Sequence, residues 1–168
     1  LNAMITITQT GAFLWNILEK GATKDELIDD LLNLAFAEDV GDGDHTTLST
    51  IPSDAMGKQK LLIKEEGIIA GVDIAKKVLN KVDPELKIEV FIEDGSRVKP
   101  GDIAFIVEGR VQSLLVAERT MLNIMQRMSG IATYTHSIAV LFEGSKTKLL
   151  DTRKTTPNMR VFEKYAVK

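Results

Sequence analysis

Two adjacent cations near the end of the chain, Arg153 and Lys154, restrict the fold more than any other feature. A short apolar run over 147–150 precedes them and is typical of a strand, while the run over 158–168 is typical of a helix. The cations therefore occupy the loop that leaves the C-terminal end of a strand. In α/β architectures this is where anionic ligands bind, so the sequence predicts an anion site at the start of an α/β domain.

The residues before this unit predict a different architecture. Thr23 and Glu26 form a capping box, and the apolar spacing behind them predicts a helix that ends before Gly41. Beyond it, the alternation of apolar and polar residues and the turn signals predict strands over 58–64, 67–70, 86–92 and 103–107, with a helix over 72–82. We therefore expect an α+β domain in which helices cover a mainly antiparallel sheet.

From Gln112 onward, apolar residues recur at spacings of three and four, which predicts an amphipathic helix. Gly130 is expected to weaken or kink this helix, because glycine is costly inside helices. A second helical run toward Phe142 should follow it. Gly144 and Ser145 then separate these connecting helices from the expected strand over 147–150.

Composition excludes several classes of function. The net charge of −3 argues against nucleic acid or an anionic membrane surface as a partner. No apolar run approaches the roughly 20 residues of a membrane span, and no basic segment followed by an apolar stretch marks a signal peptide. The chain has no cysteine, which fits a reducing compartment, and we expect it in the cytoplasm.

No metal site is expected from the residues themselves. The acidic, glycine-rich segment 39–47 superficially resembles a calcium loop, but its glycine and its distal glutamate are misplaced. This segment is expected to be a loop. The two histidines, His45 and His136, are far apart and have no zinc-binding spacing.

Four motifs occur in an order that resembles the quinolinate phosphoribosyltransferase family. They are Glu38–Thr47 (EDVGDGDHTT), Asp94–Asp102 (DGSRVKPGD), Ala117–Thr133 (AERT running on to QRMSGIAT), and Leu149–Pro157 (LLDTRKTTP) with EKYAV at 163–167. The resemblance spans nearly the whole chain. One departure is Asn158, where the family usually has glycine; asparagine tolerates a positive φ, so the turn should survive.

The resemblance implies a late step of NAD biosynthesis. In that reaction quinolinate and 5-phosphoribosyl-1-pyrophosphate give nicotinate mononucleotide, pyrophosphate and carbon dioxide. It also implies magnesium (Mg2+) bound with the sugar pyrophosphate, and a homodimer in which the subunits share their active sites. By the same resemblance, quinolinate contacts Arg119, Arg153, Lys154 and Thr155, and Arg119 reaches into the neighbouring subunit's site. Arg127 and Arg160 are ranked below these, as packing or phosphate-fringe residues.

With the resemblance, the chain divides into an α+β N-terminal domain over 4–112, connecting helices over 113–145, and the start of an α/β barrel domain over 146–168. The family continues with further catalytic, sugar-binding and metal-binding residues. One βα unit cannot close a barrel. We therefore expect these 168 residues, by themselves, to be an inactive fragment, and we assign no residue in it to a catalytic role.

Three alternatives stay open. A molybdenum-transport-associated relative shares the fold. The segment Asp94–Asp102 also resembles the turn of biotinyl and lipoyl carrier domains, although no lysine has the flanking residues that such carriers modify. The third alternative is a purely structural dimerisation domain.

Overall fold

The structure is a computed structural model that describes residues 23–168. The expected start of the N-terminal domain at Met4 lies outside the described residues. In chain order the elements are α2 (Lys24–Asp39), α3 (His45–Thr50), β1 (Met56–Leu62), β2 (Gly67–Ile68), α4 (Val72–Val82), β3 (Lys87–Val90), β4 (Arg97–Val98), β5 (Ile103–Arg110), α5 (Val111–Ala139), the 3-10 turn η1 (Val140–Phe142) and α6 (Arg160–Val167).

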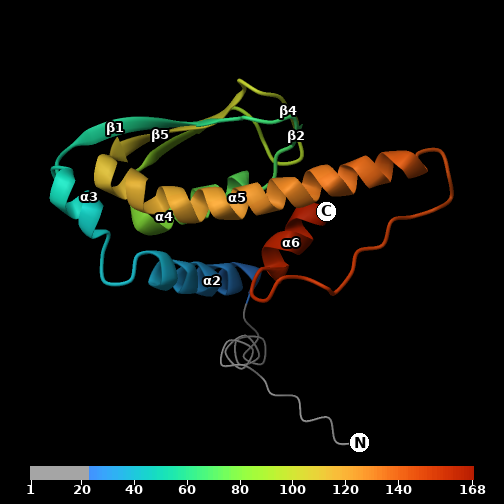
Figure 1. The fold of residues 1–168 in the computed structure, drawn as a ribbon, viewed down its shortest axis with the longest axis horizontal. Helices are drawn as coiled ribbons and strands as arrows, with labels where there is room; N and C mark the ends of the chain where they lie inside the picture. The colour runs from blue at the N-terminus through green and yellow to red at the C-terminus, as the bar shows by residue number, and fades with distance from the viewer. Residues whose placement is uncertain (1–22) are drawn as a thin grey trace, which may run out of the picture.

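The elements form three layers around the long helix α5, as Figure 1 shows. The strands lie on one side of α4 and α5, and α2 and α6 lie on the other. The larger sheet has the order β1-β5-β3 and is antiparallel throughout, while β2 and β4 form a separate antiparallel pair. The expected α+β class, with helices on an antiparallel sheet, is confirmed.

The core lies between these layers and follows the periodicity of the sequence. On α4, Val78 and Leu79 are buried, and on the central strand β5, Phe105 is buried against the same cluster. Leu114 and Met128 on α5 extend the cluster along the helix. Burying side chains of this size contributes about 1.5–3 kcal/mol each, so α5 is held along most of its length.

Local signals predicted the start of α2 correctly. The Thr23 hydroxyl accepts a hydrogen bond from the Glu26 amide, and the Glu26 carboxylate accepts one from the Thr23 amide. The segment 39–47 is only partly a loop, because α3 begins within it at His45. The Asp44 side chain caps that helix by accepting from the Thr47 amide.

Gly130, which was expected to weaken or kink the helix, does not interrupt it. The helix α5 runs without interruption from Val111 to Ala139. A Cβ placed on Gly130 would meet no atom within 4 Å, so nothing crowds the helix at that position. Packing on both sides of the helix overrides the local preference of glycine.

The strand expected over 147–150 is not formed either. These residues have no regular secondary structure, and Leu150 is 86% exposed. A strand is stabilised by its neighbours in a sheet, and residues 23–168 supply no neighbour here. The helix after the cation loop is confirmed as α6, and Asn158 has the positive φ of 66° that its turn requires.

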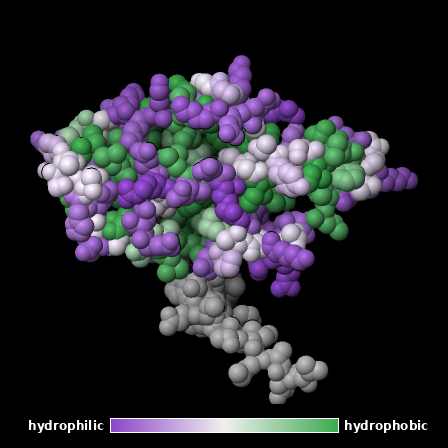
Figure 2. Space-filling view, viewed as in Figure 1, coloured by the Kyte–Doolittle hydropathy of each residue, from purple (hydrophilic) through white to green (hydrophobic). Residues whose placement is uncertain are grey.

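The surface separates into polar and apolar regions. Figure 2 shows hydrophilic side chains over the middle of the molecule and a hydrophobic area at the C-terminal end of α5. The exposed apolar residues of this end are Tyr134, Val140 and Leu141. None of the helices described here is both long and apolar enough to cross a membrane.

Candidate substrate-binding site

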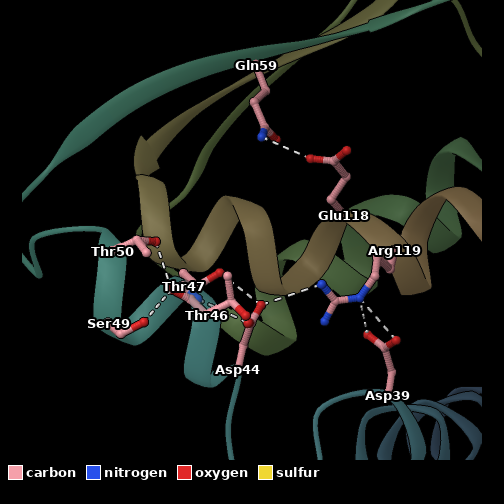
Figure 3. Close-up of polar contacts among 9 residues, drawn as sticks. All are labelled: Asp39, Asp44, Thr46, Thr47, Ser49, Thr50, Gln59, Glu118 and Arg119. Carbon is pink, nitrogen blue, oxygen red and sulfur yellow. Dashed lines mark hydrogen bonds and ion pairs between the residues drawn. The ribbon is translucent and has the colours of Figure 1, made fainter.

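Arg119 on α5 is held by two carboxylates from separate elements (Figure 3). Its Nε donates to both oxygens of Asp39, each at 3.2 Å, and its Nη1 donates to Oδ2 of Asp44 at 3.5 Å. Within residues 23–168 the second amino nitrogen, Nη2, makes no hydrogen bond. The guanidinium is thus oriented on two sides and keeps a donor for a ligand.

Asp44 is prepared for this contact by its role at the start of α3. Its side chain is 9% exposed and accepts from both the amide and the hydroxyl of Thr47. These hydrogen bonds, with a smaller contribution from Arg119, hold the pKa of the Asp44 carboxyl below its usual value. The hydrogen bond to Asp39 in turn raises the pKa of Arg119.

The neighbouring Glu118 does not pair with Arg119. Its carboxylate accepts from the side-chain amide of Gln59 on β1 at 3.1 Å (Figure 3). A simple surface pairing of adjacent residues therefore does not explain the position of Arg119. The roles of Asp39 and Asp44 as partners of Arg119 were not predicted from the sequence. For Asp44 a signal exists, because its Asp-x-x-Thr spacing to Thr47 is a helix-capping pattern.

A shallow groove lies along α5 beyond Arg119. Asn123, Gln126 and Gly130 follow Arg119 at spacings of four, three and four, so they lie on one helix face. The groove is lined by Asn123, Gln126, Arg127, Gly130, Ile131, Tyr134 and Thr135. Arg119 thus lies at one end of this helix face, four residues before Asn123. Arg127 is one of the residues that line the groove.

The predicted cation loop lies beside α6. Arg153 and Lys154 are exposed and Thr155 is half-buried. The Thr155 hydroxyl accepts from Nε of Arg160 at 3.0 Å, and the Arg153 carbonyl accepts from Nη2 of the same arginine at 3.2 Å. In the described chain the two cationic side chains form no ion pair, so their charges face solvent.

Arg127 connects this loop to α5. Its Nε donates to Oε1 of Glu163 on α6 at 2.7 Å, and its Nη2 contacts the hydroxyl of Thr156. No hydrogen bond or ion pair between described residues joins Arg119 directly to Arg153, Lys154 or Thr155. The loop therefore meets α5 at Arg127, within the groove, and Arg119 is eight residues away on the same helix, about 12 Å along its axis.

The described residues contain no group of three or more histidine, cysteine or acidic side chains arranged to hold a metal ion. His45 lies 3.3 Å from Asp42 on the surface, and His136 contacts Arg97. The expected magnesium therefore has no ligand set among residues 23–168.

Comparison with known proteins agrees with the sequence motifs. The N-terminal domain of quinolinate phosphoribosyl transferase matches residues 44–129, and the C-terminal domain of the same family matches residues 131–168. The chain belongs to the quinolinate phosphoribosyl transferase family.

Similar proteins carry consistent names. A chloroplastic nicotinate-nucleotide pyrophosphorylase (carboxylating) from Oryza sativa is 44% identical over 82% of this chain and 37% of its own length. The Mycobacterium leprae protein of the same name is 40% identical over 83% of this chain and 50% of its own. The crystal structure of NadC from Streptococcus pyogenes superposes with a TM-score of 0.80 at 39% identity, covering 83% of this chain and 50% of that one. This chain thus spans between about a third and a half of these relatives.

Proposed function

We propose that this chain supplies the quinolinate-binding residues of a decarboxylating quinolinate phosphoribosyltransferase. The observation that carries the proposal is the short separation on α5 between Arg119 and Arg127, because Arg127 contacts the loop that carries Arg153 and Lys154; the two arginines are eight residues apart, about 12 Å along the helix axis. Family membership and the names of the relatives support the same reaction.

The charges suit a flat dicarboxylate. A guanidinium grips a carboxylate through parallel hydrogen bonds, and lysine adds a mobile point charge. Arg119 offers its Nη2 group, while Arg153 and Lys154 offer side chains without an ion-pair partner among residues 23–168. Held at both carboxylates, the substrate would present its ring nitrogen in a fixed direction, which lowers the entropic part of the barrier.

The proposed reaction breaks two bonds and forms two. The ring nitrogen bonds to the anomeric carbon of the sugar as the bond from that carbon to the pyrophosphate oxygen breaks. The ring nitrogen is then positively charged and accepts electron density from the carbon–carboxylate bond beside it. Carbon dioxide leaves, and a proton takes its place on the ring carbon.

Thr155 is proposed to lie beside the dicarboxylate and to contact it through its hydroxyl or its backbone amide. The sugar pyrophosphate is proposed as the second substrate, with no ligands assigned to it among residues 23–168. Magnesium is included only as the companion of that diphosphate, because the described residues contain no ligand set for it.

We also propose a homodimer with shared sites and a cytoplasmic location. Exposed side chains on α5 and the following turn η1 support the dimer, because Arg119 and the apolar Tyr134 of α5 and Leu141 of η1 are all accessible. The cysteine-free sequence supports a reducing compartment, although some plant relatives are named chloroplastic or mitochondrial. Sedimentation velocity of the purified chain and imaging of a tagged chain in its host test these two points.

The alternative functions have less support than the transferase. The relatives that match at 40–45% identity are named for quinolinate or nicotinate nucleotide chemistry, which favours the transferase over a molybdenum-associated relative. Lys99, in the carrier-like turn, has its amide bound to Asp102 at 2.9 Å as part of a tight turn. An intact mass equal to that of the sequence would exclude a lipoylated or biotinylated carrier. Loss of quinolinate binding with retained dimerisation would favour a structural domain.

Calorimetric titration of quinolinate into the chain tests the proposal. The double substitution Arg153→Ala and Lys154→Ala should abolish binding. The matched control is Lys146→Ala with Lys148→Ala, which removes the same charge from exposed residues of the preceding segment and should leave binding within about twofold. Equal losses in both variants, or no binding by the unchanged chain, would contradict a dicarboxylate site at the loop.

A further inference from the structure

Glu163 is a charged side chain that the proposed chemistry does not use. It lies in the first turn of α6 and its side chain is only 9% exposed. Acidic side chains are almost never buried without a specific partner. Its position between α5 and the cation loop therefore needs an explanation.

Glu163 connects three parts of the structure. Its carboxylate accepts from Arg127 on α5, with Nε at 2.7 Å from Oε1. It also accepts from the backbone amide of Thr156, at 3.3 and 3.4 Å to its two oxygens. Burial alone would raise the pKa of the Glu163 carboxyl, but the hydrogen bonds from Arg127 and Thr156 outweigh it and hold the pKa below its usual value.

The cation loop has few other restraints. In the described chain, the backbone hydrogen bonds between 146 and 159 are local, from Thr155 to the Arg153 carbonyl and from Met159 to the Thr156 carbonyl. The contacts from outside this segment come from side chains: Arg160 and Lys164 from α6, and Arg127 with Glu163 at Thr156. Arg160, Glu163 and Lys164 all belong to α6, which packs on the core through Phe162 and Ala166. Within the described chain, Arg127 is the α5 side chain that hydrogen-bonds this loop directly, and Glu163 holds both Arg127 and the loop.

We propose that Glu163 is a positioning residue that, through Arg127, sets the separation between Arg119 and the Arg153–Lys154 pair. Arg119 and Arg127 belong to one continuous helix, so a fixed Arg127–Glu163–Thr156 connection fixes the loop relative to Arg119 as well. The role given to this separation, the binding of a dicarboxylate, rests on the proposed function. The restraint on the loop is testable without any ligand.

Amide hydrogen exchange and 15N relaxation across 152–156 provide the first test. Glu163→Ala should speed exchange at the Thr156 amide at least tenfold and increase loop motion, because the carboxylate acceptor is lost. Glu163→Gln keeps an acceptor of the same shape and should recover part of the protection. Glu66→Ala, an exposed acid between β1 and β2, is the control and should leave the loop unchanged.

A second variant provides the test if Glu163→Ala does not fold. Arg127→Ala removes the link from the α5 side, so it should loosen the same amides, and combining it with Glu163→Ala should add little. Amides of β5 and α4 report whether each variant is folded. If Glu163→Ala is unfolded, Glu163→Gln and Arg127→Ala decide: unchanged exchange at Thr156 in both overturns the proposal.

Quinolinate titrations then separate this inference from the proposed function. Glu163→Ala should weaken binding about tenfold, with partial rescue by Glu163→Gln. Binding that is unchanged while the loop is mobile overturns the positioning role. If the unchanged chain binds no quinolinate but Glu163→Ala still loosens the loop, the proposed function fails and the restraint on the loop stands.

Discussion

Arg110 at the end of β5 donates through Nε to Oδ2 of Asp83 at the end of α4, at 2.9 Å. The Asp83 side chain is 1% exposed and also accepts from the Ser113 hydroxyl at 2.8 Å and from the Glu85 amide at 3.1 Å. These hydrogen bonds, the one from Arg110 first, lower the pKa of Asp83 from 3.8 to about 2. The contact joins the sheet to the helical layer where α5 begins.

Asp83→Asn should therefore destabilise the chain at neutral pH by about 1–2 kcal/mol. The value is modest because Arg110 is half-exposed and solvent screens its charge. Since the folded pKa lies below the unfolded one, the stabilisation is complete above pH 4 and is lost as the pH falls toward 2. Urea unfolding at pH 7, 4 and 2.5 should show the variant approaching the unchanged chain as the pH falls.

Glu85→Gln is the control for this prediction, because Glu85 is 82% exposed and lies 3.8 Å from Arg110. Its free energy of unfolding should change by less than about 0.5 kcal/mol. A constant difference between Asp83→Asn and the unchanged chain from pH 7 to 2.5 would contradict the ionised state assigned to Asp83.

Two glycines should respond to alanine with opposite signs. A Cβ on Gly67 would lie 2.5 Å from Oγ1 of Thr133, the atom that accepts from the Ile68 amide, so Gly67→Ala should cost about 1–3 kcal/mol. A Cβ on Gly130 would meet nothing within 4 Å, so Gly130→Ala should stabilise α5 by about 0.5–1 kcal/mol. Thermal unfolding of both variants checks the signs; destabilisation by Gly130→Ala would reveal a close approach to that face.

The sequence predicted those features that depend on near neighbours along the chain. The capping box at Thr23 relies on contacts within one helix and was correct. The strand around Phe105 was also correct, and its partners β1 and β3 lie within the described residues. The strand over 147–150 failed because a strand requires partners that local sequence does not reveal. The restraint of Arg119 by Asp39 was missed for a related reason: 80 residues separate the two.

Arg119→Lys should weaken quinolinate binding about tenfold. A lysine ammonium cannot contact Asp39 and Asp44 through one planar group and still offer a donor to a carboxylate in a fixed direction. Calorimetry measures the affinity, and Arg97→Lys, which changes an exposed arginine on β4, should leave it unchanged. Equal affinities for Arg119→Lys and Arg97→Lys would remove Arg119 from the site.

Thr23→Ala should destabilise α2 by about 1 kcal/mol, because the helix loses the hydroxyl that accepts from the Glu26 amide. Circular dichroism during urea unfolding measures the loss. Thr46→Ala, an exposed threonine in the first turn of α3 whose side chain does not cap, serves as the control and should have little effect. A Thr23→Ala variant as stable as the control would mean that the capping box contributes nothing.

The continuity of α5 limits which insertions and recombinations the sequences of such chains can tolerate during evolution. The two family segments meet at residue 130, in the interior of this helix rather than in a linker. Inserting a single residue there would rotate everything beyond it by about 100° and shift it by about 1.5 Å. Recombination between relatives at this boundary therefore has to preserve helical phase, and insertions are expected to accumulate in the 143–150 segment, where no such phase exists.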